Sequence, residues 1–122
     1  MKNLLILILV INTTILSAQT ITFNIYSESK LVNLVESEYS EIQGKILVDL
    51  DKKYIQIEDN YFHIENIESS KDKKGSYYNF TYTEVEIEKF VTVLFPKRKD
   101  HHIIMIIANS KGDGWLYYCE IL

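Results

Sequence analysis

Hydrophobic and polar residues alternate along most of this chain, and the alternation is clearest between Gly44 and Glu68. Apolar side chains recur there at every second position in three short runs, which are 46–50, 55–57 and 62–64. Successive side chains of a strand point to opposite faces of a sheet, so a period of two indicates strands with one buried face. Asp51-Lys52-Lys53 and Asp59-Asn60 have the residue types of turns. This stretch therefore predicts three short strands folded back on one another.

Five further segments have a strand pattern: Thr20–Tyr26, Tyr77–Thr83, Glu84–Phe95, His102–Ala108 and Trp115–Ile121. The apolar phase changes between the second and third of these segments, which predicts a bend or bulge near Thr83. We interpret Ser69–Ser76 as a polar loop and Pro96–Asp100 as a charged hairpin tip.

The segment His102–Ala108 differs from the others because both of its alternating sets are apolar or nearly so. A strand of this kind is covered on both faces. Either it lies centrally under a helix, or its second face belongs to an oligomer interface.

Residues 29–40 are ambiguous. Apolar residues recur at the i, i+3, i+4 spacing of an amphipathic helix, with Ser27 or Ser29 as a candidate cap, but several of these residues have only middling helix propensity. A short helix and an irregular strand remain equally compatible with this segment. The rest of the pattern predicts an all-β fold, a single antiparallel meander of about seven or eight strands that closes as a barrel or half-barrel, since closure removes exposed edges. A two-sheet sandwich is the alternative.

The first eighteen residues have the features of an export signal. Lys2 is followed by an apolar run from Leu4 to Ile11, and Leu16-Ser17-Ala18 forms a plausible cleavage site. The run is shorter than the roughly 20 residues that span a bilayer, so we expect no transmembrane segment after signal removal. The sequence thus predicts a signal peptide at 1–18, a single β domain at 19–122, and a periplasmic or extracellular location.

The net charge and the cysteine content argue against two kinds of function, nucleic-acid binding and disulfide-linked assembly. The net charge is −4 and the single arginine is Arg98, so the chain is poorly suited to nucleic acid, which attracts clustered Lys and Arg. Cys119 is the only cysteine and lies in an apolar strand, which favours a buried, inert thiol over a disulfide-linked dimer. The oligomeric state stays open.

Few residues suggest reactive chemistry. A metal site would require His63, Cys119 and a histidine of the pair His101–His102 to converge, and the sequence predicts neither a metal nor a cofactor. Glu84, Glu86 and Glu88 are interpreted as an acidic row on a solvated strand face. Lysines at 71, 73, 74, 97 and 99, with Arg98, occupy two predicted loops, where they either form one basic patch or are simply solvated.

Aromatic residues are the one enrichment that suggests binding. Tyr and Trp combine a flat apolar body with a polar tip, which suits ligand pockets and protein interfaces, although strand tyrosines often serve packing alone. The candidate ligand or interface residues are Tyr54, Tyr61, Tyr77, Trp115 and Tyr117.

The order of segments ILVDLD, YIQI, YFHI and the closing strand GWLYYCEI, after a signal that ends in Ser-Ala-Gln, resembles a loose set of short exported proteins of Bacteroidetes bacteria. The chain lacks the Asp-x-x-Gly-x-x-Cys stretch found mid-chain in that set. The set has no assigned activity, so the resemblance implies an exported all-β protein and no site residues.

The sequence as a whole predicts a non-catalytic binding module whose partner is an unknown small molecule or protein. A ligand carrier would need a cavity lined by Tyr and Trp inside the sheet, whereas a protein-interaction or inhibitor module would have a solid core and an exposed apolar patch around Ile103 to Ile107. A small hydrolase is the third hypothesis and would need at least two titratable groups meeting in one cleft.

Overall fold

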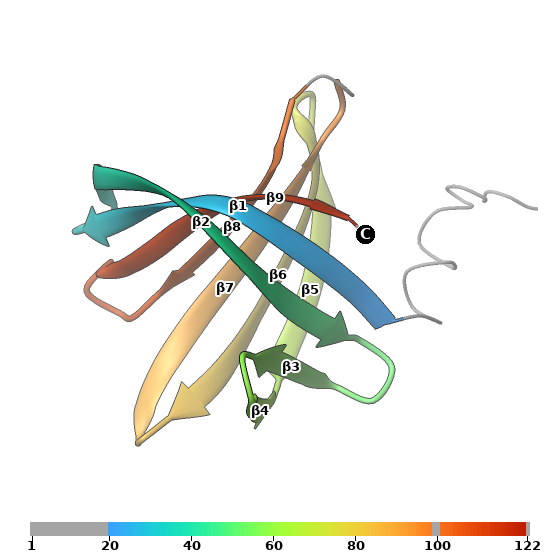
Figure 1. The fold of residues 1–122 in the computed structure, drawn as a ribbon. Helices are drawn as coiled ribbons and strands as arrows, with labels where there is room; N and C mark the ends of the chain where they lie inside the picture. Colours follow the sequence, from blue (N-terminus) through green and yellow to red (C-terminus); the bar gives the residue numbers. More distant parts are fainter. Residues whose placement is uncertain (1–19, 99–100, 122) are drawn as a thin grey trace, which may run out of the picture.

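The computed structural model describes residues 20–98 and 101–121, and every regular element in these ranges is a β-strand. The strands are β1 (Thr20–Val32), β2 (Val35–Asp49), β3 (Tyr54–Ile57), β4 (Asn60–His63), β5 (Glu65–Lys71), β6 (Gly75–Glu84), β7 (Ile87–Pro96), β8 (Ile103–Ala108) and β9 (Gly114–Ile121). They form one antiparallel sheet of nine strands that curls into a nearly closed barrel (Figure 1). The all-β meander and its barrel-like closure are confirmed.

The sheet closes through a single bent segment of the chain. The strand order is β4-β3-β2-β1-β9-β8-β7-β6-β5, so β4 and β5 form its two edges although only Ile64 separates them in sequence. β4 pairs with β3, while β5 pairs with β6. Ile64 is fully buried, and its backbone N–H donates to the carbonyl of Lys53 at 3.0 Å. The rings of Phe62 and Tyr82, with centroids 4.9 Å apart, pack across the join.

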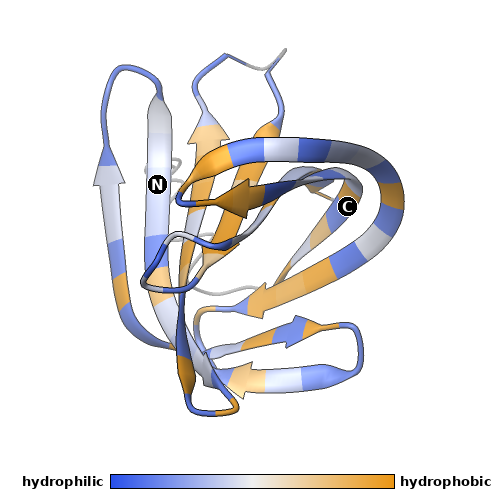
Figure 2. Ribbon diagram, turned by 90° about the vertical axis from the view of Figure 1, so that its left-hand side faces the viewer, coloured by the Kyte–Doolittle hydropathy of each residue, from blue (hydrophilic) through white to orange (hydrophobic). Residues whose placement is uncertain are grey.

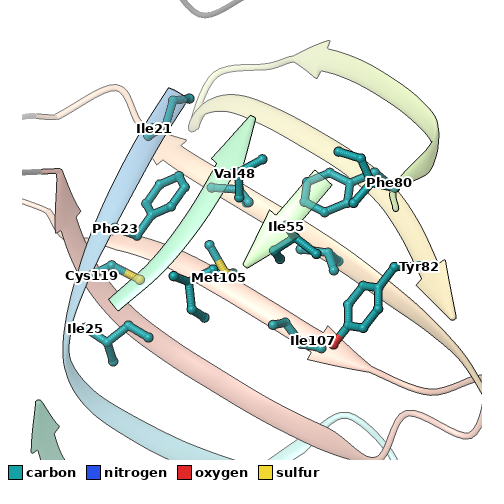
Figure 3. Packing of buried hydrophobic residues seen from close by; sticks show 14 residues of the cluster. Ile21, Phe23, Ile25, Val48, Ile55, Phe80, Tyr82, Met105, Ile107 and Cys119 are labelled. Carbon is teal, nitrogen blue, oxygen red and sulfur yellow. The ribbon is translucent and has the colours of Figure 1, made fainter. Parts of the chain in front are cut away.

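The barrel interior is filled by side chains. Inward-facing residues from β1, β2, β3, β6, β7, β8 and β9, together with Ile64, form one hydrophobic cluster (Figure 3). At its centre, Phe23, Ile55 and Met105 are each at most 1% exposed. A partly open void of about 10 Å³ lies between β1, β2, β6 and β7, which is room for one water molecule at most.

A bulge at Tyr26 changes which side of β1 faces inward. Ile25 pairs with Cys119, which is buried in the core, whereas Ser27 pairs with Tyr118. Residues opposite each other share a face, so one unpaired residue moves the following side chains to the other face. Beyond the bulge, Ser27, Ser29 and the residues in phase with them lie on the outer face, and Tyr26 also turns outward against His102.

Residues 29–40 contain no helix. β1 extends to Val32, and β2 begins at Val35 after a turn in which Asn33 and Leu34 have positive φ. Ladder bonds to β9 and between β1 and β2 hold the segment extended. The irregular-strand alternative is therefore the correct one. The helix-like spacing arises because the turn and a bulge near Glu38 interrupt the alternation.

The bend expected near Thr83 is a hairpin turn instead. β6 ends at Glu84, and β7 starts at Ile87. Val85 and Glu86 have φ of 49° and 64°, the signs that a tight two-residue hairpin turn requires. The chain reverses there, so the prediction of one acidic row is wrong: Glu84 pairs with Ile87, and Glu88 pairs with Thr83 on the neighbouring strand.

Two other boundaries differ from the prediction. The loop predicted at Ser69–Ser76 is shorter at both ends, since β5 continues to Lys71 and β6 begins at Gly75.

The predicted signal at 1–18 lies outside the described residues. Within the part of the chain that the structure describes, no helix has the length and apolar character to cross a membrane.

Removal of the Phe23 ring is expected to destabilise the barrel. Phe23→Ala leaves a cavity among β1, β2 and β7, so the free energy of unfolding should fall by about 3–5 kcal/mol. Val35→Ala, at a side chain that is 66% exposed, should change it by less than about 0.5 kcal/mol. Urea denaturation measures both, and equal losses for the two variants would contradict the assignment of the core.

The Cys119 thiol is expected to be unreactive until the protein unfolds. Its side chain is 1% exposed, and burial raises the pKa of the thiol to about 12, so little thiolate forms near neutral pH. A thiol-specific reagent such as dithionitrobenzoate should therefore modify Cys119 in denaturant and not in the folded state. Rapid modification of the folded protein, or a disulfide-linked dimer, would contradict this.

Candidate functional site

The five aromatic residues predicted for binding occupy three separate places. Tyr54 on β3 and Tyr61 on β4 lie on the outer face, with ring centroids 5.5 Å apart, and Tyr61 is 65% exposed. Tyr77 lies on the outer face of β6, and its hydroxyl hydrogen-bonds to Asp72. Desolvation, followed by this hydrogen bond, raises the pKa of the Tyr77 phenol. The structure brings Tyr54 and Tyr61 together and keeps them apart from the other three.

Trp115 and Tyr117 belong to the inward phase of β9, next to Cys119. Burial, followed by the negative charge of Glu28, raises the pKa of Tyr117 to about 12. Trp115 is 39% exposed and pairs with Ile107 and Lys30. Tyr117 therefore serves the core, and Trp115 lies at the margin of the barrel.

A second apolar surface lies on the outside of the barrel, over β8. Met105 and Ile107 point into the core, so Ile104 and Ile106, which alternate with them, point outward. Ile104 lies between Leu94 of β7 and Tyr118 of β9, and Ile106 lies between Thr92 and Leu116. We call the resulting surface the β8 outer face; it consists of Leu94, Ile104, Ile106, Leu116 and Tyr118.

No helix covers this surface within residues 20–98 and 101–121, so the first of the two alternatives for this strand, a helix packed on its second face, is wrong. The members of the β8 outer face are neither fully buried nor fully exposed. Phe90, which is in phase with Leu94 and is 43% exposed, extends the surface along β7. Contiguous apolar side chains on an outer face mark an interaction site more often than scattered ones do.

Aromatic rings from three other places border the β8 outer face. Tyr26 of β1 packs edge-on against His102 at a centroid distance of 5.0 Å, and His102 lies 6.5 Å from Tyr118. Tyr39 of β2 also lies 6.5 Å from Tyr118. The bulge at Tyr26 produces this grouping, because it turns that ring outward beside β9.

Glu36 fixes one side of this border. Its Oε2 atom accepts hydrogen bonds from the hydroxyls of Ser29, at 2.7 Å, and Tyr118, at 3.2 Å. Partial burial, followed by the charge and hydrogen bond of Glu36, raises the pKa of Tyr118. Among the described residues, the hydroxyls of Tyr26 and Ser27 are buried without a hydrogen-bond partner. Buried hydroxyls without a hydrogen-bond partner are costly to a folded protein.

Sequence reasoning anticipated one part of this surface and missed the other. The apolar character of both faces of His102–Ala108 was a visible signal, and it indicated the β8 outer face. The border residues Tyr26, Tyr39 and His102 had no such signal, because they meet only through the bulge and through β1–β9 pairing.

Titratable side chains do not gather at any one place suited to a metal. In the described ranges, no three residues of the types His, Cys, Asp and Glu converge to hold an ion. His63 is exposed on β4, whereas Cys119 lies inside the barrel. His101 and His102 border an open hollow beside β9 that also includes Arg98 and Glu120.

Neutralising Glu36 is expected to lower the pKa of Tyr118. Glu36→Gln removes a negative charge that disfavours the phenolate, so the pKa of Tyr118 should shift down toward its ordinary value. The measurement is a titration followed by the ¹³Cζ chemical shift of the assigned tyrosine ring. Glu41→Gln, on the same strand, is the matched control and should leave the titration unchanged; an unchanged titration in Glu36→Gln would contradict the contact.

No protein-family model, curated protein or solved structure matches this chain. The fold and the arrangement of the β8 outer face are therefore the basis for a functional proposal.

Proposed function

We propose that this chain is an exported, non-catalytic interaction module that binds a partner protein through the β8 outer face. One observation carries the proposal: the interior of the barrel is filled, while Ile104 and Ile106 turn apolar side chains to the outside. A small-molecule carrier would need internal space, and the void of about 10 Å³ between β1 and β7 is far below the roughly 300 Å³ of a ligand pocket.

The composition of the surface supports a protein partner. Protein interfaces have an apolar centre and a border in which tyrosine is common. Leu94, Ile104, Ile106 and Leu116 would form the centre, and the tyrosines Tyr118 and Tyr39 would form the border. The hydroxyl of Tyr118 is already oriented by Glu36, so it would lose little conformational entropy on binding.

The exported protein, purified from the cell envelope of its own organism, provides the test. Native mass spectrometry reports bound protein, bound small molecule and stoichiometry in one measurement. We expect a second protein in complex with the wild type. The variant Ile106→Lys places a charge at the apolar centre and should weaken that complex by at least about 30-fold, the effect of losing an interface hot spot.

Leu47→Lys is the matched control, because Leu47 lies on the outer face of β2, is similarly half-buried and is remote from β8 in the strand order. It should retain the partner. Three results would contradict the proposal: a retained small molecule in place of a protein, a homodimer alone, or equal loss of the partner in both variants. Circular dichroism confirms that each variant is folded before binding is compared.

A further inference from the structure

The tips of two hairpins form one end of the barrel. The backbone N–H of Lys97, after β7, donates to the carbonyl of Lys74, before β6, at 2.8 Å. Gly75 and Pro96 are opposite each other in the adjoining ladder. Figures 1 and 2 show both tips at the same end of the molecule, and Figure 2 shows that both are hydrophilic. The two predicted loops therefore make a single surface.

Positive charge is concentrated on this surface, which we call the basic tip pair. It consists of the exposed residues Lys71, Lys73, Lys74, Lys97 and Arg98. Within residues 20–98 and 101–121, no carboxylate forms an ion pair with Lys71, Lys73 or Lys97.

The one carboxylate inside the β5–β6 tip is held by the turn itself. Oδ1 of Asp72 accepts the N–H groups of Lys74, at 2.8 Å, and Gly75, at 3.3 Å. The hydrogen bond from the Lys74 backbone is the main reason why the pKa of Asp72 is lowered. Asp72 therefore shapes the turn that presents the lysines, and it offsets only one of their charges.

An open hollow of about 440 Å³ adjoins the basic tip pair. Pro96 lines it together with the partly exposed sides of Phe95 and Ile103, which otherwise pack against the core. The polar side chains of Arg98, His101 and His102 lie beside them, and Cys119 and Glu120 lie on the β9 side. Apolar surface directly beside basic groups is the combination that suits a lipid–water interface, where acyl chains and charged headgroups meet.

Acidic residues lie at the opposite ends of the same strands. The β6–β7 turn is flanked by Glu84 and Glu88 and contains Glu86. β6 begins at the basic tip pair and ends at this acidic turn. The charge is thus separated along the barrel, and a negatively charged surface would attract the basic end and repel the other.

We propose that the basic tip pair docks on the phosphate headgroups of an anionic lipid bilayer, with the apolar side of the hollow against the membrane interface. A single-stranded nucleic acid is less well matched, because such chains are bound in grooves with stacked aromatic rings, and these tips are convex hairpins. The inference concerns a different surface from the β8 outer face, so it stands or fails separately from the proposed function.

Vesicle co-sedimentation of the mature protein tests this inference. The wild type should bind vesicles of phosphatidylcholine mixed with phosphatidylglycerol, should not bind phosphatidylcholine alone, and should dissociate as salt is raised. Each lysine at such a surface contributes about fivefold in affinity, so the double variant Lys73→Gln/Lys97→Gln should bind about 25-fold more weakly.

The matched control is Lys30→Gln/Lys111→Gln, which removes the same charge from exposed positions near the β1–β2 and β8–β9 turns. It should bind as the wild type does. The inference is overturned if neither vesicle binds the protein, if both bind it equally, or if the two double variants lose affinity equally. If glycerophosphate displaces the protein from vesicles at constant ionic strength, the tips bind a free phosphate group and not the bilayer. If the protein is retained on heparin but does not bind vesicles, the tips bind a polyanion.

Discussion

Closure of the sheet by one bent segment is the constraint on which the rest of the structure depends. Residues 60–71 pair with β3 at their start and with β6 at their end, so the chain passes from one edge of the sheet to the other around Ile64. β4 and β5 do not pair with each other, but the bend between them brings the two halves of the inner face together. A barrel of this size can be filled by its own side chains, and here inward-facing residues from most of the strands form one core cluster.

The filled interior determines where binding can occur. With Phe23, Ile55 and Met105 occupying the centre, any partner must be met on the outside of the barrel. The strand β8 is suited to this because it is apolar on both faces, and only one face is needed for the core. Its other face places the apolar side chains of Ile104 and Ile106 on the outside of the barrel. A contiguous apolar surface in that position is typical of an interaction site.

Local irregularities give the outside of the barrel its chemistry. The bulge at Tyr26 turns a ring outward against His102, and Glu36 then orients Tyr118 beside it. At one end, the backbone hydrogen bond between Lys97 and Lys74 joins two basic tips that are more than twenty positions apart in the sequence. Each of these features depends on hydrogen bonds between strands, so each is a property of the register rather than of the local sequence.

Alternation by itself determined the strands, the inward phase of β2 and β3, and the apolar character of both faces of β8, because a period of two follows directly from strand geometry. It could not locate the interruptions. The turn at Val85–Glu86 looked like a bend, and the interrupted phase of 29–40 imitated a helical spacing, since a one-residue change of register has no signature in composition. Only the tertiary structure decided that the barrel is solid, that Tyr26 meets His102 beside Tyr118, and that the two basic tips share one end. These contacts join residues that are distant in the sequence and are brought together only by the pairing of the strands.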